Sequence, residues 1–179
     1  MGPITYGLCN SAVGAVIWIT GLCSFPPLIE PTEVHLKNPG LLLNQEFKVP
    51  VEKSYLLTLH FTFPSTEARL TDEVVGSRFD HNCGGETEYS KIPEQERLGL
   101  GRPLPLRILV KNSSNGSLVF EKTFHSLCSS GHATDDKWIN VGRIPLKEGT
   151  FRIEVQNVAP NPAFDGLKVT MALVSGNAK

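Results

Sequence analysis

The sequence lacks an excess of either sign of charge. Its 17 lysine and arginine residues almost balance its 18 aspartate and glutamate residues, so the net charge at pH 7 is −1. The basic residues form no stripe along the chain. A protein that binds nucleic acid needs a positive surface, because contacts to the phosphate backbone supply much of the affinity. Nucleic acid is therefore not an expected partner.

Charged side chains are missing altogether from the first 29 residues, and Glu30 is the first. This stretch holds a compact apolar run from Ala12 to Ile19, and Pro26-Pro27 ends any helix there. A secretory signal peptide has an apolar region of this length, and a membrane anchor needs only a slightly longer one. We expect residues 1–29 to be a signal peptide or a membrane anchor, and residues 30–179 to be the folded domain.

Two features depart from an ordinary export signal. No lysine or arginine precedes the apolar run, whereas signal peptides begin with a positively charged region. The bulky Leu22 directly precedes Cys23, which argues against lipidation of that cysteine. A buried N-terminal helix of a cytosolic fold remains the alternative to export.

Motifs that carry catalysis are also missing. The chain contains no Gly-x-Ser-x-Gly elbow and no His-Glu-x-x-His helix. Gly99-Leu100-Gly101 is followed by Arg102-Pro103 and a predicted strand, whereas a dinucleotide fingerprint opens a helix. We therefore expect a protein that is not an enzyme and uses no cofactor.

Among the features that are present, residues 54–63 give the clearest structural signal. The odd-numbered positions from Tyr55 to Phe63 are all large and apolar, and the even-numbered positions are mostly polar. Alternation of this length is typical of a strand with one face in the core. We predict a central strand that buries its odd-numbered side chains.

After Pro31 the remaining sequence shows further short strands separated by turn signals. The expected strands cover residues 33–37, 43–51, 104–111, 117–124, 138–146, 150–158 and 167–174. Asn115-Gly116 is typical of a tight hairpin turn, because both residues tolerate positive φ angles. This pattern predicts an all-β, jelly-roll-like antiparallel β-sandwich.

One short helix is expected between the central strand and Gly76. Ser65 or Thr66 can cap its start, and Gly76 can take the left-handed position at its end. Leu70 and Val74 lie one turn apart, so we expect them to hold the helix against the sheet.

Two irregular loops, over residues 77–102 and 124–136, hold the candidate site residues. These are His81, Cys83, His125, Cys128 and His132. If the protein is exported, a Cys83–Cys128 disulfide is the simplest account of the two cysteines. Free thiols are one alternative, and a zinc site drawing four ligands from the five residues is another, although the spacing matches no common zinc module. We expect no metal, and we expect both loops to lie side by side at one end of the sandwich as a binding surface.

Several short motifs resemble an uncharacterised protein family. They are Phe61-Thr62-Phe63-Pro64-Ser65, Glu67-Ala68-Arg69-Leu70, Val75-Gly76, Pro103-Leu104-Pro105-Leu106-Arg107-Ile108 and Gly149-Thr150-Phe151-Arg152-Ile153. The family consists of small proteobacterial envelope proteins, often lipoproteins, labelled only as a domain of unknown function. The resemblance covers about residues 30–176, implies export and a β-sandwich, and supplies no catalytic residue.

Taken together, these observations lead us to expect a non-catalytic β-sandwich of the bacterial envelope. It would reside in the periplasm, or be anchored in the membrane through its N-terminal segment and face the periplasm. We expect it to bind a protein partner, in an immunity-like or accessory role. The alternative is a carbohydrate-binding module, for which Trp138 and Tyr89 are the candidate stacking platforms.

Overall fold

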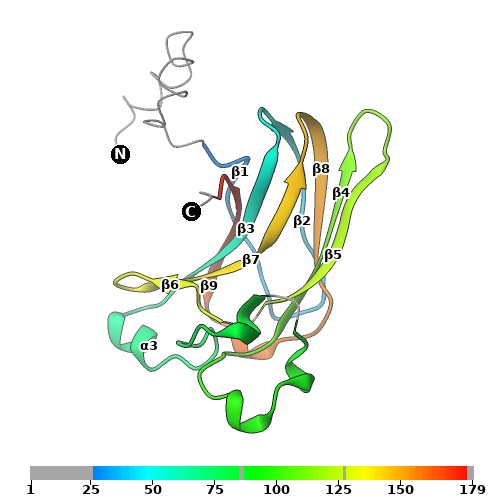
Figure 1. Ribbon diagram of the computed structural model, residues 1–179. Helices are drawn as coiled ribbons and strands as arrows, with labels where there is room; N and C mark the ends of the chain where they lie inside the picture. The colour runs from blue at the N-terminus through cyan, green and yellow to red at the C-terminus, as the bar shows by residue number, and fades with distance from the viewer. Residues whose placement is uncertain (1–25, 85–86, 127, 177–179) are drawn as a thin grey trace.

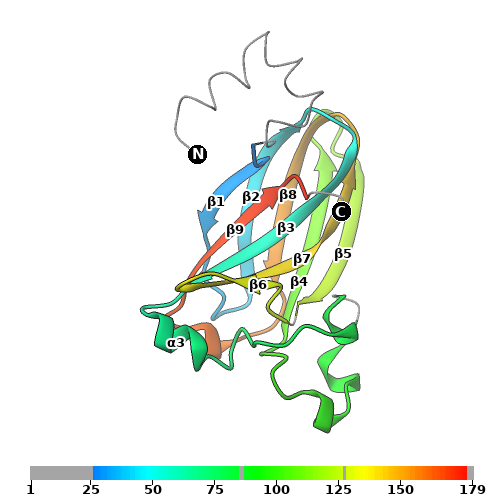
Figure 2. The ribbon, with the colours of Figure 1, turned by 60° about the vertical axis from the view of Figure 1, so that its left-hand side comes forward.

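Two antiparallel β-sheets face one another in the computed structural model, which describes residues 26–84, 87–126 and 128–176 (Figures 1 and 2). The five-stranded sheet has the order β1 (Ile29–Glu33), β9 (Lys168–Val174), β3 (Lys53–Thr62), β7 (Asp136–Leu146) and β6 (Gly131–His132). The four-stranded sheet has the order β2 (Gly40–Val49), β8 (Gly149–Asn157), β4 (Leu104–Asn112) and β5 (Leu118–Ser126).

The strand pairing is nested. β1 pairs with β9, β2 with β8, β3 with β7, and β4 with β5, so outer strands of the sequence enclose inner ones. This is the pairing of a jelly roll, in which a long folded-over hairpin wraps into two sheets. The predicted all-β sandwich is confirmed.

β3 is the central strand that the alternation predicts. It pairs with β7 on one side and β9 on the other, and its side chains at Tyr55, Leu57, Leu59 and Phe61 are fully buried. The facing sheet contributes Leu104, Leu106, Ile108 and Val110 from β4, which are also fully buried. Each such side chain stabilises the fold by about 1.5–3 kcal/mol relative to an exposed position.

β1 differs from the predicted strand over residues 33–37. It begins at Ile29, and it includes Pro31 because it is the edge strand of its sheet, where a missing N–H breaks no ladder. Val34 and Leu36 follow the strand and are nevertheless buried, as their alternation suggests.

The predicted helix is much shorter than expected. The α-helix α3 covers only Thr66–Leu70, and the Ser65 side chain caps it by accepting a backbone N–H of the first turn. The helix stops because the Asp72 carboxylate accepts the N–H groups of Val74 and Val75, which bends the chain into a turn. The prediction that the helix continues to Gly76 is therefore wrong.

The face assignment of this helix is wrong for Leu70, whereas Val74, beyond the end of the helix, does pack against the main core. Leu70 is 68% exposed, so it does not hold the helix against the sheet. The buried residue is Arg69, whose Nε donates to the Thr134 carbonyl at 2.8 Å. α3 therefore attaches to the turn between β6 and β7 through a polar side chain.

The long connections gather at one end of the sandwich, at the bottom of Figure 1. They are residues 63–103, residues 128–135 and residues 158–167, and we call them the loop end. The second loop is shorter than predicted, because β5 continues to Ser126 and residues 131–132 form β6. In the described part of the chain no helix is long and apolar enough to cross a membrane. The predicted signal or anchor falls largely on residues 1–25, outside the described residues.

Candidate functional site

Residues 77–102, which we call the loop module, dominate the loop end. They contain three short 3-10 helices, η1 (His81–Gly84), η2 (Tyr89–Lys91) and η3 (Glu94–Glu96). Its two ends are hydrogen-bonded at the base: Ser77 N–H donates to Gly99 O at 2.9 Å, and Arg102 N–H donates to Val74 O at 2.7 Å. The module therefore leaves and re-enters the sandwich at one point.

Two glycines make this closure at the base feasible. Gly76 and Gly101 both have positive φ angles, +83° and +80°. A Cβ on Gly76 would lie 2.6 Å from Gly101 N, and a Cβ on Gly101 would lie 2.6 Å from Val75 O. Only glycine meets both the backbone angle and the close approach.

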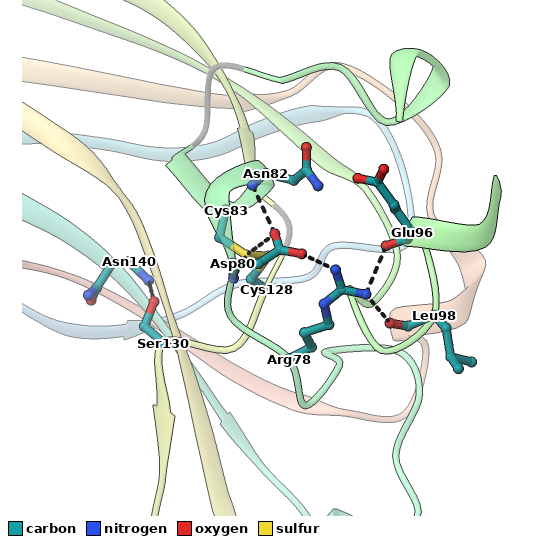
Figure 3. Close-up of a disulfide and its surroundings, with 9 residues drawn as sticks. All are labelled: Arg78, Asp80, Asn82, Cys83, Glu96, Leu98, Cys128, Ser130 and Asn140. Atoms are coloured by element: carbon teal, nitrogen blue, oxygen red, sulfur yellow. Dashed lines mark hydrogen bonds and ion pairs between the residues drawn. A yellow bond between two sulfur atoms is a disulfide. The ribbon is translucent and has the colours of Figure 1, made fainter. Parts of the chain in front are cut away.

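A disulfide ties the module to the second loop. Cys83 in η1 is bonded to Cys128, with a Cα–Cα distance of 5.5 Å and a sequence separation of 45 (Figure 3). The Cys128 N–H also donates to the Leu100 carbonyl at 3.1 Å. The expected disulfide is thus present, and the two loops lie side by side.

The disulfide belongs to a small hydrophobic cluster that is separate from the main core. Ile92, Leu100 and Cys128 are fully buried, with Cys83 and Tyr89 packed against them. This cluster gives the module an interior of its own, although a very small one.

A polar network lies beside the disulfide. The Arg78 guanidinium pairs with the Asp80 carboxylate and donates to the Glu96 carbonyl at 3.2 Å (Figure 3). The same carboxylate accepts the Asn82 N–H at 2.8 Å. Desolvation by burial raises the pKa of Asp80, but the Asn82 N–H and the Arg78 charge outweigh it, so the pKa lies below its usual value.

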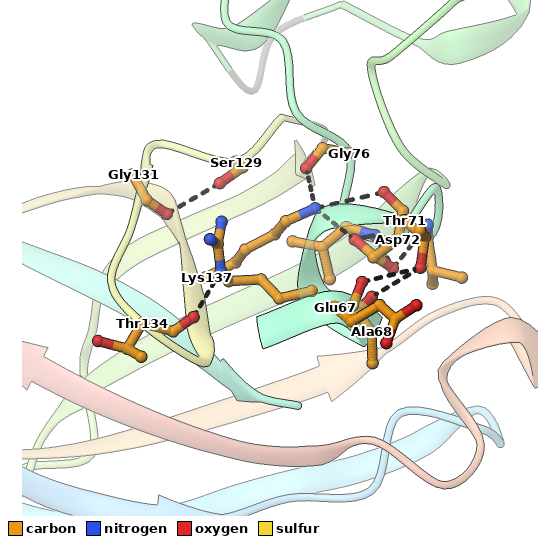
Figure 4. A network of polar contacts seen from close by, with 12 residues as sticks. Glu67, Ala68, Thr71, Asp72, Gly76, Ser129, Gly131, Thr134 and Lys137 are labelled. Carbon is orange, nitrogen blue, oxygen red and sulfur yellow. Dashed lines mark hydrogen bonds and ion pairs between the residues drawn. The ribbon is translucent and has the colours of Figure 1, made fainter. Parts of the chain in front are cut away.

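A buried ion pair fixes the segment that precedes the module. Lys137 Nζ on β7 donates to Asp72 Oδ2 and to the Gly76 carbonyl, both at 2.7 Å (Figure 4). Both charged side chains are about 95% buried. Because the pair is shielded from water, it holds residues 72–76 against β7.

The five predicted site residues do not form one group. Both sulfur atoms are in the disulfide, so neither is a thiolate ligand. Among the described residues, potential ligand atoms gather only at Asp80, Cys83 and Cys128, and no histidine joins them. His81 lies 3.8 Å from a Glu96 carboxylate oxygen, whereas the other two histidines lie on strands: His125 on β5 and His132 on β6.

Both candidate sugar platforms are in contact with neighbouring side chains. The Arg97 guanidinium lies 4.9 Å from the centre of the Tyr89 ring. Trp138 stacks with His60 at a centroid distance of 6.3 Å, and its indole lies over Gly131. Each ring thus has a neighbouring side chain against part of its surface, and both rings remain partly exposed.

The sequence analysis missed two hollows of the loop end. A groove of about 590 Å³ has Leu70, Tyr89, Arg97 and Leu98 in its lining. A smaller pocket of about 240 Å³ shares Leu70 with it and is lined mainly by polar side chains. Leu98, which lies between Arg97 and Gly99 in a stretch rich in charged residues and glycines, is a local signal for the groove, whereas no local signal marks the pocket.

Fold and site together define a jelly-roll β-sandwich with a disulfide-bonded loop module at one end. The chain belongs to the family described as "Domain of unknown function (DUF5625)", whose model matches residues 30–175. The expected membership of a family without known function is therefore confirmed.

The fold is similar to that of a protein whose structure has been solved. The solved structure is the crystal structure of a protein from Sulfurospirillum deleyianum, with 15% sequence identity and a TM-score of 0.62, covering 86% of this chain and 100% of that chain. At this identity the likeness concerns the fold alone. A search of curated proteins finds no match.

Proposed function

We propose that the protein is a non-catalytic, exported β-sandwich that binds a protein partner through its loop end, in an immunity-like or accessory role. One observation carries the proposal. The three most exposed large apolar side chains of the described residues are Leu70 (68%), Phe79 (65%) and Leu98 (84%). All three lie in the connection between β3 and β4, and Leu70 and Leu98 line the same groove. Exposed apolar side chains gathered on one surface are typical of protein-binding sites.

The composition of the groove supports the same proposal. Leu70 and Leu98 line it together with Tyr89 and Arg97, and tyrosine and arginine are enriched where proteins bind each other. The groove lies on a segment fixed by the glycine contact at its base and by the disulfide. A surface that is already ordered loses less conformational entropy on binding.

The disulfide supports residence outside the cytoplasm. Disulfides persist in oxidising compartments such as the bacterial periplasm, and they are rare in the reducing cytosol. The uncharged residues 1–29 are consistent with export as well. We expect alkaline phosphatase fused after Pro31 to be active, whereas an inactive fusion found wholly in the cytosol would contradict export.

Site-specific photo-crosslinking in cells tests partner binding. A photoreactive amino acid at Leu98 should give a discrete adduct, and the added change Leu70→Asp should abolish it by placing a charge in the groove. The control position is Leu118, which is 54% exposed but lies in the hairpin at the opposite end of the sandwich. An adduct missing at Leu98, or an identical adduct at Leu118, would contradict the proposal.

A further inference from the structure

The smaller pocket of the loop end has an unusual balance of charge. It lies beside α3 and the start of β7, and its polar lining comes from Arg69, Ser77, Ser129, Ser130, His132 and Lys137. Of these six side chains, two carry a permanent positive charge. Because the pocket and the groove share Leu70 and Ser77, the two hollows form one continuous surface.

Only one of the two cations has a counter-charge. The Lys137 ammonium is neutralised by Asp72, and its hydrogens are used by that carboxylate and by the Gly76 carbonyl (Figure 4). Arg69 is 91% buried, yet no carboxylate of the described residues lies within ion-pair distance of it. Buried charges in proteins are normally paired, since an isolated one is costly to remove from water.

Arg69 also has hydrogen-bond donors to spare. A guanidinium carries five N–H donors, and in the described part of the chain only Nε has an acceptor, the Thr134 carbonyl at 2.8 Å. That bond fixes the side chain and leaves the four N–H groups of the two terminal nitrogens for another acceptor.

A second donor lines the pocket at Ser130. Its Oγ accepts the Asn140 N–H at 2.9 Å, so its own hydroxyl hydrogen remains available (Figure 3). Ser129 differs, because its hydroxyl donates to the Gly131 carbonyl at 2.9 Å (Figure 4). The pocket therefore presents the Arg69 guanidinium and the Ser130 hydroxyl as donors to an incoming group, with Ser77 at the edge that it shares with the groove.

We propose that this pocket binds a single carboxylate, supplied by an acidic side chain of the protein partner. The planar fork of a guanidinium matches a carboxylate in geometry, and one unpaired positive charge matches one negative charge. A phosphate near −2 would leave one negative charge uncompensated in the same place. The source of the carboxylate rests on the proposed function, and the affinity of the pocket for a carboxylate does not.

Nuclear magnetic resonance titration of the full chain, with its disulfide intact, tests the pocket directly. The probe is acetyl-glutamate amide, which carries one side-chain carboxylate, and the matched control is acetyl-glutamine amide at the same ionic strength. The carboxylate probe should shift the Arg69 Nε–Hε and Ser130 amide resonances saturably, and the neutral probe should not. Equal responses to both probes, or no saturable response, would overturn the proposal.

Inorganic phosphate and sulfate form the second arm. If either saturates the Arg69 resonance at a lower concentration than the carboxylate probe does, the assignment to a carboxylate is wrong. If the carboxylate probe binds but crosslinking at Leu98 fails, the carboxylate site is supported and the proposed binding of a protein partner is contradicted. If crosslinking at Leu98 succeeds but the carboxylate probe does not bind, only the carboxylate site is contradicted.

Variants separate binding from folding. Arg69→Gln should weaken probe binding by at least about tenfold, because it removes a charge-assisted hydrogen bond. Leu118→Ser lies in the hairpin at the opposite end of the sandwich and should leave probe binding unchanged. If Arg69→Gln does not fold, Ser130→Ala decides: it should fold and still bind the probe several-fold more weakly, and unchanged binding would contradict the proposed donor.

Discussion

The sandwich and the loop module are stabilised in different ways. The core of the sandwich is one large cluster of apolar side chains supplied by both sheets, and β3 alone contributes four fully buried residues. The small cluster inside the module has three fully buried residues, of which Ile92 and Leu100 belong to the module and Cys128 to the second loop. The module is stabilised instead by glycine contacts, a disulfide and the Lys137–Asp72 pair, because it buries little apolar surface. The comparison suggests that a segment without a large core can display apolar side chains when covalent and polar contacts fix it.

The largest expected effect comes from a charge in the main core. Leu59→Asp and Phe61→Asp each bury an unpaired carboxylate, so we expect a loss of more than about 4 kcal/mol and failure to fold. Thr62→Asp on the exposed face of the same strand is the matched control and should be mild. Circular dichroism and urea unfolding measure both. Similar behaviour of both sets would mean that β3 is buried on its two faces.

The next effect concerns the buried ion pair. Lys137→Met leaves Asp72 buried without its partner, so we expect a loss of about 3–5 kcal/mol in the free energy of unfolding. The control is Lys111→Met, which removes the partly exposed pair with Glu154 and should cost no more than about 1 kcal/mol. Equal losses would show that the buried pair does not fix the module.

The glycine contact at the base of the module gives a smaller effect. Gly76→Ala combines a left-handed backbone with a clash at 2.6 Å, so we expect a loss of about 3 kcal/mol. Gly116→Ala has a similar φ of +69° but open space around its Cβ, so about 1 kcal/mol is expected. Urea unfolding of the two variants compares clash with backbone strain, and equal losses would contradict the close contact.

The smallest effect is the dependence of the module on pH. Because the pKa of Asp80 is lowered in the folded protein, its contribution to stability is complete above its unfolded pKa of about 3.9 and is lost as the pH falls through the lower folded value. The wild type should therefore be more stable than Asp80→Asn near pH 6, and the difference should shrink below about pH 4. A difference in denaturation midpoint that stays constant between these pH values would contradict the assignment.

Much of the sandwich is predictable from local patterns. The alternation from Tyr55 to Phe63 identifies the central strand and its buried face, and the Asn115-Gly116 turn identifies the β4–β5 hairpin. These features are determined by side-chain periodicity and turn geometry, which are properties of neighbouring residues. β1 is the exception, because Pro31 is acceptable in a strand only once that strand is known to lie at an edge.

The loop end is less predictable, because its contacts join residues far apart in the chain. The disulfide was inferred from the expected compartment. In contrast, nothing in the sequence near Arg69 or Lys137 indicates that either side chain is buried. The helix was predicted too long because Leu70 and Val74 have helical spacing, whereas the Asp72 side chain captures the N–H groups that a longer helix needs.

The central claim is that the loop module needs the disulfide to stay folded, whereas the sandwich stays folded without it. Hydrogen exchange of the wild type and of the double variant Cys83→Ser, Cys128→Ser tests it most directly, by comparing the Ile92 and Leu100 amides of the module with the Leu59 amide of β3. Opening a cross-link that spans 45 residues should lower global stability by up to about 4 kcal/mol. We predict that in the variant the module amides exchange as fast as exposed loop amides, while Leu59 stays strongly protected. Module amides that keep their protection, or that exchange at the same rate as Leu59, would contradict the account.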